Sequence, residues 1–264
     1  MEHIMKFTVL GFFALLIIAE LIWARFQKKS IYNPKETLSN IIILTVNQLL
    51  KPLVLVWSFM VFSWVGKLTL LQLPNHWAMY VLAAIMVDFL LYWQHRIHHE
   101  VALLWTIHNV HHSSPWMNFT TAFRINWIGG FISPVFFLPA ILLGFTPTQV
   151  TGFLFLNLVY QFLLHTESVG KIPFLEGWLN TPSAHRVHHG SNPKYIDKNY
   201  GGVLMIWDRM FGTYQAEEEE VVYGVTTGFE GHNPVWAVFG PMVRFFKGEY
   251  QREMRNVGTF IDPD

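Results

Sequence analysis

The stretch "HRIHHEVALLWTIHNVHH", residues 95–112, places six histidines within eighteen positions. It directly follows an apolar run, "WAMYVLAAIMVDFLLYWQ", at 77–94, and a third copy of its pattern, "HRVHH", returns at 185–189. Residues at positions i, i+3 and i+4 of a helix share a face, so each copy brings its histidines together. The sequence therefore predicts apolar helices that end in clusters of imidazoles.

The composition is typical of a membrane protein. Hydrophobic residues make up 52% of the 264 residues and charged residues only 14%, whereas ordinary soluble domains are about 25% charged. Mean hydropathy is +0.30. The formal net charge is zero, which gives no indication of a nucleic-acid partner. The length allows one large domain or two small ones.

Apolar segments predict the membrane topology. The apolar segment at 40–65 contains Lys51 and Pro52, so it is either one kinked span or an interfacial stretch at 36–50 followed by a crossing at 53–72. The segment at 7–23 lacks a small-residue cleavage site, which favours a retained helix over a signal peptide. We expect an all-α integral membrane bundle of about four to five hydrophobic segments, in which the last two form a hairpin. These segments are 7–23, 40–65, 77–94, 127–145 and 148–165.

Basic residues predict the orientation of this bundle. Arg25, Lys28, Lys29 and Lys35 follow the first segment, which places that loop in the cytoplasm by the positive-inside rule. Alternate crossings then bring every histidine cluster and the acidic run at 217–220 to the same side. We expect a histidine-rich, metal-binding cap that faces the cytoplasm from a bacterial inner membrane or the endoplasmic reticulum.

The histidine clusters predict metal binding. Neutral imidazole is a common ligand of iron, zinc and copper, and the absence of cysteine leaves only nitrogen and oxygen ligands. Three triplets offer more ligands than one ion can use, which favours two ions. The alternatives are a hydrated histidine-rich loop, a single structural zinc, or a membrane protein for metal transport or storage. Transporters place polar ligands inside several spans, whereas these histidines lie at helix ends.

Common hydrolase motifs are absent from the sequence. A zinc protease of the H-E-x-x-H type requires a second histidine three residues after the glutamate. Leu103 occupies that position after His99 and Glu100. The chain also contains neither G-x-S-x-G nor a P-loop.

Three segments carry a family resemblance: "DFLLYWQHRIHHEVALLWTIHNVHHSS", "QFLLHTE" and "LNTPSAHRVHHGSNPKYIDKNYGGVLMIWDRMFGTY". Over about residues 85–215 they resemble the fatty acid hydroxylase/sterol desaturase superfamily, and within it most closely the members that cleave alkylglycerol ether lipids. The resemblance implies an integral-membrane, non-haem di-iron oxygenase. It divides the chain into N-terminal membrane segments (1–75), a catalytic domain (76–215) and a cytoplasmic or interfacial tail (216–264).

The resemblance also implies the metal ligands. His98 departs from the family pattern, since the ether-lipid-cleaving members resemble this sequence with a small residue there, so we expect it to support a ligand or lie at the surface. His3, His76 and His232 lie outside the clusters, and we expect interfacial or surface roles for them. The nine implied ligands are His95, His99, His108, His111, His112, His165, His185, His188 and His189.

Several polar residues near the clusters are candidates for catalytic or supporting roles. Asp88 lies two turns before His95, and we expect it to orient that ring. The resemblance implies that Asp197, Asn199 and Asp208 support the last cluster. Glu100 and Glu167 follow ligands closely, so each is either a base near the metals or part of a surface ion pair, for example Glu100 with Arg96.

The resemblance implies the reaction as well. Two iron ions would use O2 to hydroxylate an aliphatic C–H bond of a lipid, and the position implied is the carbon beside the ether oxygen of an alkylglycerol. Zinc can take the place of iron when the protein is overexpressed. The alternative is a fatty-acyl or sterol hydroxylase or desaturase on the same site. Electrons would come from a separate donor, a tetrahydropterin or a cytochrome b5-like or ferredoxin-like protein.

We expect the lipid to reach the site from the bilayer, between the 77–94 helix and the 127–165 hairpin. Its head group would lie near Arg96, Arg186 and Lys194. Phenylalanines of the hairpin either line this route or face lipid and the core: Phe131, Phe136, Phe153, Phe155 and Phe162.

Overall fold

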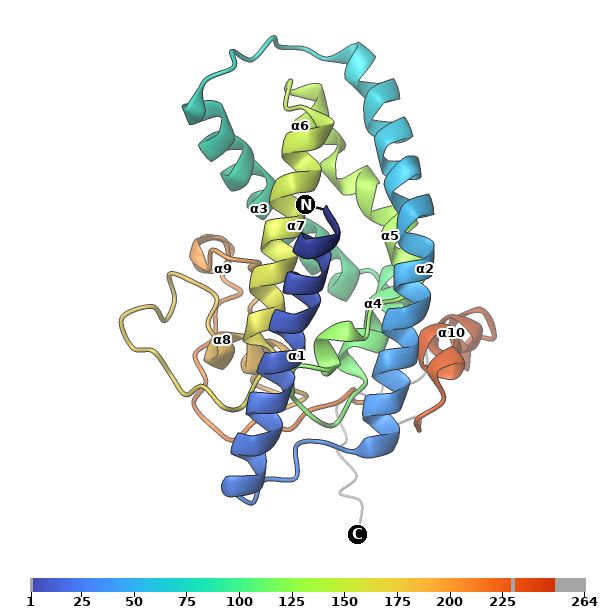
Figure 1. Cartoon of the computed structure of the whole chain (residues 1–264), viewed down its shortest axis with the longest axis vertical. Helices are drawn as coiled ribbons and strands as arrows, with labels where there is room; N and C mark the ends of the chain where they lie inside the picture. The colour runs from blue at the N-terminus through green and yellow to red at the C-terminus, as the bar shows by residue number, and fades with distance from the viewer. Residues whose placement is uncertain (1, 229–230, 250–264) are drawn as a thin grey trace.

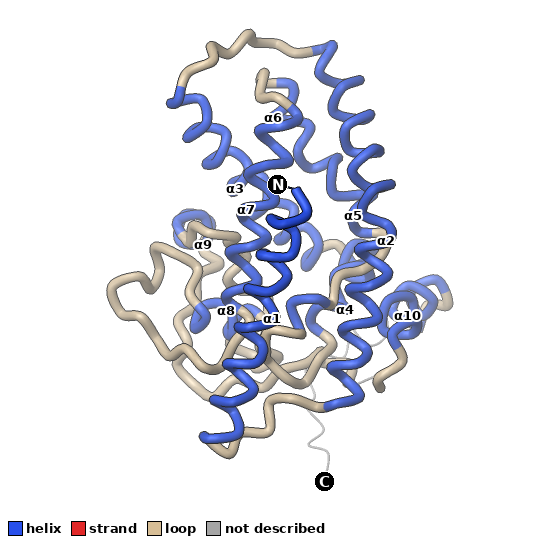
Figure 2. Tube along the Cα trace, viewed as in Figure 1, coloured by secondary structure: helices blue, strands red, loops and turns tan. Residues whose placement is uncertain are grey.

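The computed structural model describes residues 2–228 and 231–249, with side chains from residue 11 onward. This part of the chain is all-helical and contains no β-strand (Figure 2), as the sequence predicts. Its elements are α1 (Glu2–Phe26), α2 (Pro34–Val65), η1 (Gly66–Leu68), α3 (Trp77–Glu100), α4 (Ala102–His112), η2 (Thr121–Phe123), α5 (Gly129–Ile132), η3 (Ser133–Phe137), α6 (Leu138–Leu142), α7 (Pro147–Leu164), α8 (Pro182–His188), α9 (Ile206–Phe211) and α10 (Pro234–Phe246).

Helices α1, α2 and α7 run along the long axis of the molecule (Figure 1). The connection between α2 and α3 lies at one end, whereas α8, α10 and the longer loops gather toward the other (Figures 1 and 2). Helix α3 packs against both α4 and α7, and α10 packs against α4 and α2. The segments that carry histidines therefore meet toward one end of the bundle.

Helix α2 is a single continuous helix. Asn33 caps its start by accepting hydrogen bonds from the backbone N–H groups of Lys35 and Glu36, and Pro34 occupies the first turn, where proline is tolerated. Pro52 lies inside the helix without ending it. Of the two arrangements expected for this region, the structure has the single helix rather than an interfacial stretch and a separate crossing.

Two helices in the described part of the chain are long and apolar enough to cross a membrane, Pro34–Leu68 and Trp77–Glu100. Only 11% of the apolar window of the first is buried, so its large apolar side chains face outward, as lipid-contacting side chains do. The first expected segment, 7–23, falls within α1, and its side chains before residue 11 lie outside the described residues. The total number of spans stays a prediction.

The apolar segment expected at 127–145, which either spans the bilayer or inserts only part of the way, is not one continuous helix in the structure. Gly129–Leu142 is divided among α5, η3 and α6, because Gly129, Gly130, Pro134 and Pro139 interrupt regular helix formation. A 14-residue helix would in any case extend about 21 Å, less than the roughly 30 Å of a hydrocarbon core. These short elements pack on α2 and α3 through a core that contains Phe62, Val87, Phe137 and Ile141.

Buried polar side chains fix the end of the bundle that carries the histidines. Arg124 is 1% exposed, and it donates hydrogen bonds to Glu36 and Asn40 of α2 and to the Val110 carbonyl and Ser113 hydroxyl oxygens at the end of α4. This network holds the last turn of α4 against α2.

A second buried acid ties α1 to the histidine end of the bundle. Glu20 is 2% exposed and accepts hydrogen bonds from Tyr32, from the Phe119 backbone and from the hydroxyl of Thr166. Since Thr166 directly follows His165, Glu20 fixes the end of α7.

Candidate metal site

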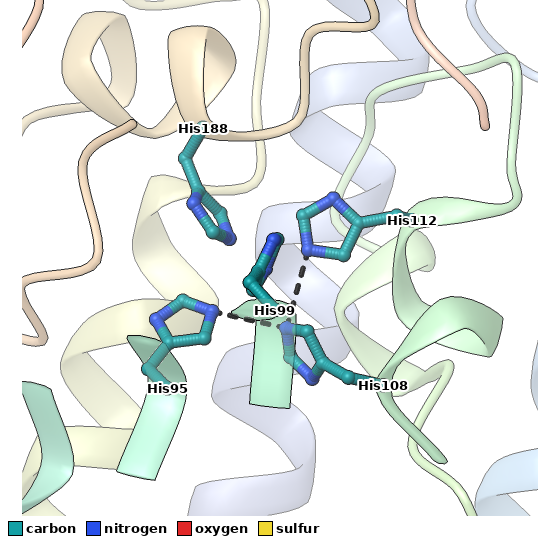
Figure 3. A group of neighbouring side chains, drawn as sticks. All are labelled: His95, His99, His108, His112 and His188. Atoms are coloured by element: carbon teal, nitrogen blue, oxygen red, sulfur yellow. Dashed lines mark hydrogen bonds between the residues drawn. The ribbon is translucent and has the colours of Figure 1, made fainter. Parts of the chain in front are cut away.

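Nine histidines form two groups among the described residues, and each group could hold a metal ion. Group A comprises His95 and His99 of α3, His108 and His112 of α4, and His188 of α8. The ligand atoms within each group lie within 4.8 Å of one another. Figure 3 shows that the five rings of group A point toward a common centre. Nε2 of His108 lies 3.0 Å from Nε2 of His95 and 3.2 Å from that of His112.

Group B comprises His111 of α4, His165 at the end of α7, and His185 and His189 from α8 and the residue after it. All four are buried. Nε2 of His165 lies 3.2 Å from Nε2 of His111 and 3.1 Å from that of His185, which in turn lies 3.2 Å from Nε2 of His189. The structure thus brings together all nine histidines that the sequence indicates.

The histidine triplets divide between the two groups, which the sequence analysis did not anticipate. In α4, His108 and His112 at i and i+4 enter group A, whereas His111 at i+3 enters group B. The third triplet does the reverse, since His185 and His189 enter group B and His188 enters group A. Adjacent residues of a helix point about 100° apart. Two neighbouring histidines of one triplet can therefore face different groups, and each of these two triplets contributes to both.

The donor set fits a transition-metal ion. Metal–imidazole bonds are about 2.0–2.1 Å long, so two ligands at adjacent coordination positions have nitrogens roughly 3 Å apart, as the Nε2 atoms here do. Nε2 of His99 and Nε2 of His188 are buried and have no hydrogen-bond partner among the described residues. A bound ion would satisfy both, which is the usual resolution of a buried unpaired polar atom.

Burial keeps the imidazoles neutral. It lowers the pKa of His165 and that of His188 to about 4, although a hydrogen bond to a backbone carbonyl opposes the shift in each. Burial, reinforced by neighbouring histidines, also places the pKa of His111, His112 and His185 well below the ordinary value. The neutral imidazole is the form that binds a metal ion, so these groups are ready to do so at neutral pH.

Asp88 does not orient His95 as expected. Its carboxylate accepts hydrogen bonds from Asn157, from the Val203 and Leu204 backbone and from the Trp207 indole. Nδ1 of His95 instead lies 2.9 Å from the carbonyl oxygen of Tyr200. Asp88 therefore joins α3 to α7, to the 203–204 backbone and to α9, and no hydrogen bond links it to a histidine among the described residues.

The other candidate acids have different surroundings. Glu100 forms the expected ion pair with Arg96 at 2.7 Å, and its side chain is 46% exposed. Glu167 pairs with Lys29. Oδ1 of Asp197 lies 3.5 Å from Nδ1 of His99, so Asp197 is the one of these three carboxylates that lies within 4 Å of a ring nitrogen in group A or B.

Asn199 and Asp208 are buried in the loops around α8 and α9. Asn199 donates to the Ala184 carbonyl of α8, and Asp208 accepts from the backbone N–H groups of Tyr200 and Gly201. Asn199 thus holds the backbone of α8, and Asp208 holds the backbone at 200–201; their support of the last cluster stays a prediction.

The remaining histidines lie outside groups A and B. His98 is 5% exposed, contacts the Gln94 carbonyl through Nδ1 at 2.6 Å, and packs on Phe136; it is buried rather than at the surface. His76 caps the start of α3, and Nδ1 of His232 lies 3.1 Å from a carboxylate oxygen of Glu36. The side chain of His3 lies outside the described residues.

The expected head-group cations are already paired. Arg186 is 7% exposed and donates two hydrogen bonds to the carboxylate of Glu217, and Lys194 pairs with Glu218. Arg96 is held by Glu100. The positions of these three basic residues therefore do not identify a binding site for a lipid head group.

The hairpin phenylalanines do not share one environment. Phe162 stacks on Phe119, whereas Phe155 is 49% exposed. Phe136 and Phe153 pack against the main hydrophobic core. They therefore do not line one common channel.

A cavity of about 260 Å³ opens beside the histidines. Its wall includes His99 and His188 of group A and His189 of group B, so one opening reaches both groups. Trp105 also lines it, with ring centroids 4.8 Å from His99 and 5.3 Å from His112. Sequence analysis missed Trp105, although its position one turn before His108 in an amphipathic helix placed it near the cluster. The rest of the wall comes from Asn109 and His112 of α4 and from the loops at 190–197 and 224–227.

Fold and site together define the class. This is an all-helical protein with helices apolar enough to span a membrane and with two adjoining histidine groups suited to metal ions. The fatty acid hydroxylase family model matches residues 80–213, a segment that contains all nine histidines, and the chain belongs to this family.

Individual relatives agree with the family assignment. The chain is 47% identical over 170 residues to the alkylglycerol monooxygenase of Danio rerio, covering 64% of this chain and 37% of that protein. The human alkylglycerol monooxygenase is 45% identical over 172 residues, with 64% and 38% covered. The ornithine lipid hydroxylase of Rhizobium tropici is 33% identical over 154 residues, with 53% and 44% covered. The matches thus span less than half the length of these relatives. No solved structure matches the chain.

Proposed function

We propose that the chain is a membrane-bound, non-haem di-iron monooxygenase that hydroxylates an aliphatic C–H bond of a lipid. The observation that carries this proposal is the convergence of nine neutral, mostly buried imidazoles into two adjoining groups. The named activities of the matched relatives, alkylglycerol monooxygenase and ornithine lipid hydroxylase, support a lipid substrate. In this proposal residues 76–215 form the catalytic domain, flanked by membrane segments at 1–75 and a tail at 216–264.

Two bound iron ions would supply the activation of O2 at this site. The protein's part is to hold the ligands, exclude water and position the lipid. Insertion of one oxygen atom into a C–H bond consumes O2, two electrons and two protons and releases one water. Since the chain carries no flavin, haem or iron–sulfur motif, a separate donor must supply the electrons, either a tetrahydropterin or a cytochrome b5-like or ferredoxin-like protein.

The cavity beside the histidines is our proposed access for O2, protons and reductant. It contacts ligands of both groups and is lined by polar side chains such as Ser191 and Asp197. The lipid would reach the groups from the other side, along the apolar surfaces of α2 and α3. With the histidine end facing the cytoplasm, the reacting carbon would lie only a short distance below the head group, as the carbon beside an ether oxygen does.

We propose an alkylglycerol ether lipid as the substrate. Hydroxylation beside the ether oxygen forms a hemiacetal, which breaks down to an aldehyde and a free glycerol hydroxyl. The second candidate is 2-hydroxylation of an acyl chain on a polar lipid, which the similarity to an ornithine lipid hydroxylase favours. That carbon lies at a comparable depth.

One comparison of substrates tests the proposal. Iron-loaded protein in lipid nanodiscs is given O2 and an alkylglycerol, an acyl-amino lipid or a sterol, each with a tetrahydropterin or with a reduced ferredoxin. We expect fatty aldehyde only from the alkylglycerol. Protein loaded with zinc, which does not change oxidation state, is the control. Hydroxylation of only the acyl chain or the sterol would reject the ether-lipid assignment, and the absence of any product would reject the monooxygenase.

A further inference from the structure

The loop at residues 197–200 supplies backbone partners to two histidines of group A. The carbonyl oxygen of Lys198 lies 2.9 Å from Nδ1 of His188, and the carbonyl oxygen of Tyr200 lies 2.9 Å from Nδ1 of His95. A carbonyl oxygen can only accept a hydrogen bond, so each Nδ1 must carry the proton. The lone pair is therefore on Nε2, the atom of His95 that faces His108.

The same loop also contacts His99 of group A. The Tyr200 ring is fully buried and packs on His95, His99 and His188, with ring centroids 5.8, 5.1 and 6.1 Å away. Asp197 contributes the carboxylate that lies 3.5 Å from His99. One short segment thus contacts histidines from α3 and α8, which are far apart in the sequence.

Among the described residues, group B makes no comparable hydrogen bond with this loop. Nδ1 of His165 lies 2.8 Å from the carbonyl oxygen of Gln161, four residues earlier in its own helix. Nδ1 of His185 is buried and has no hydrogen-bond partner in the described part of the chain. A displacement of the 197–200 loop would therefore affect group A first.

The backbone of this loop adopts an unfavourable conformation. Asp197 and Asn199 have φ angles of 58° and 59°, in the left-handed region that costs most residues roughly 1–2 kcal/mol and that asparagine and aspartate tolerate best. Such a conformation persists only where the surroundings enforce it. The hydrogen bonds that hold this loop in the left-handed conformation come mainly from Asn199.

The side chain of Asn199 is fully buried and holds the loop from both sides. Nδ2 donates hydrogen bonds to the Ala184 carbonyl at 2.9 Å and to the Gln215 carbonyl at 2.7 Å, and Oδ1 accepts from the Gln215 backbone N–H at 2.8 Å. The backbone N–H of Asn199 donates to the Thr213 carbonyl at 3.0 Å. These bonds fix α8, the loop and the segment after α9 together.

We infer that Asn199 is a positioning residue that prepares group A, and not group B, for its metal ion. It acts through the carbonyl groups of its two chain neighbours, Lys198 and Tyr200, which set the Nδ1–H tautomers of His188 and His95. Partners of this kind orient metal-bound histidines, and their loss typically weakens metal binding about 10–100-fold. This inference rests on the proposed binding of two metal ions.

The test counts metal ions in backgrounds that isolate each group. His165→Ala leaves group A complete, and His188→Ala leaves group B complete, so each single variant should retain one ion. Asn199→Asp is nearly the same size, but it removes both N–H donors and places a carboxylate oxygen against the Ala184 and Gln215 carbonyls. We expect Asn199→Asp to remove the remaining group A ion when it is combined with His165→Ala. When it is combined with His188→Ala, the remaining group B ion should stay bound.

The matched control is Asn126→Asp. Asn126 is 3% exposed, its Nδ2 donates to the Val238 carbonyl and its Oδ1 accepts from the Ile128 backbone, both at 2.9 Å. Asn126→Asp makes the same amide-to-carboxylate change at a buried position outside the 197–200 loop. The His165→Ala and His188→Ala proteins should therefore each keep their remaining ion when Asn126→Asp is added. If Asn199→Asp does not yield folded protein, Asn199→Gly replaces it in both backgrounds, since glycine accepts the left-handed backbone but lacks the amide. Group A should then release its ion to a chelator at least about tenfold faster than group B does.

Three results would overturn the inference. In the first, Asn199→Asp in the His165→Ala background keeps its ion and releases it at an unchanged rate. In the second, Asn199→Asp removes the same amount of metal in both backgrounds. In the third, Asn126→Asp removes as much metal as Asn199→Asp does. Failure of the proposed function is distinguishable, because the unaltered protein would then bind fewer than two ions before any change at Asn199.

Discussion

His112 and His189 stack with their ring centroids 4.4 Å apart and their planes 21° apart, although His112 belongs to group A and His189 to group B. The adjacent pair His111 and His112 is divided in the same way. The two groups are therefore neighbours joined by shared segments, rather than two separate sites. This arrangement suits two metal ions that act on one substrate.

The first prediction concerns metal content. We expect the unaltered protein, purified without oxygen and loaded with Fe(II), to hold two ions per chain. His188→Ala and His165→Ala should each reduce the content to about one, because each removes a ligand from a different group. Elemental analysis of protein quantified by amino-acid analysis measures this. A content of one ion in the unaltered protein, or the loss of both ions from either variant, would contradict two independently filled groups.

The second prediction separates His98 from the ligands. His98→Ala should keep both ions, because His98 belongs to neither histidine group, whereas His99→Ala should lose one. The His98 ring is buried and hydrogen-bonded, so its removal should lower the free energy of unfolding by about 1–3 kcal/mol. Metal analysis and thermal unfolding in detergent test the two effects separately. Loss of an ion from His98→Ala would show that His98 is a ligand.

The third prediction concerns pH. Burial lowers the pKa of His165 and of His188 to about 4, while an unfolded histidine titrates near 6.5. As the pH falls from about 7 to about 5, the unfolded chain therefore takes up protons that the folded chain does not. The metal-free protein should become less stable over this range, and stability should return as the pH rises.

Bound metal should follow the folded-state pKa values instead. His165 and His188 stay neutral until the pH approaches about 4, and burial holds the pKa of His111, His112 and His185 well below the ordinary value. Metal content should therefore be constant between roughly pH 7 and 5.5 and fall at lower pH. Dialysis at stepped pH followed by metal analysis measures this. Half-loss near pH 6.5, as expected for solvent-exposed imidazoles, would contradict the buried site.

The fourth prediction compares two ion pairs. Nη1 of Arg124 lies 2.8 Å from Oε1 of Glu36, and each of these side chains is 1% exposed. The side chains of Lys29 and Glu167 are 48% and 20% exposed. Arg124→Ala leaves a buried carboxylate without its main partner and should cost about 3–5 kcal/mol of unfolding free energy. Lys29→Ala should cost less than about 1 kcal/mol. Similar shifts in the unfolding transitions of the two variants would contradict the structural importance of the Arg124 network.

Much of this fold and site was predictable from local patterns. The histidine repeats at i, i+3 and i+4, placed after apolar runs, indicate convergence of imidazoles without knowledge of the tertiary structure. The division of the second and third triplets between groups A and B was not predictable, because it depends on how α4 and α8 are rotated toward each other. The partners of Asp88 were missed for a related reason, since Val203, Leu204 and Trp207 reach it from the start of α9 and the loop before it, more than 110 residues later in the chain.

The supporting role of Asn199 was implied only by family resemblance. Its action through the carbonyls of Lys198 and Tyr200 depends on a left-handed backbone that sequence patterns do not reveal. The interrupted segment at Gly129–Leu142 was within reach of the sequence, because its two adjacent glycines and two prolines oppose a continuous span.

The last prediction concerns topology. The chain has no cysteine, so single cysteines report accessibility without background. Ser30 lies in the exposed loop between α1 and α2, and the side chain of Glu218 is 53% exposed near the histidine end. Leu70, 73% exposed, lies in the connection between α2 and α3 at the opposite end (Figure 1). The 32 residues of α2 extend about 48 Å, enough to cross a hydrocarbon core of about 30 Å.

We therefore expect Ser30→Cys and Glu218→Cys to react with a membrane-impermeant maleimide from one side, and Leu70→Cys only from the other. Cell-derived vesicles of known orientation, labelled before and after permeabilisation, provide the measurement, and the permeabilised sample controls for side-chain reactivity. Labelling of Leu70→Cys and Ser30→Cys from the same side would mean that α2 does not cross the membrane. Labelling of Ser30→Cys and Glu218→Cys from opposite sides would instead require an odd number of crossings between them, and would separate the basic loop after α1 from the histidine end.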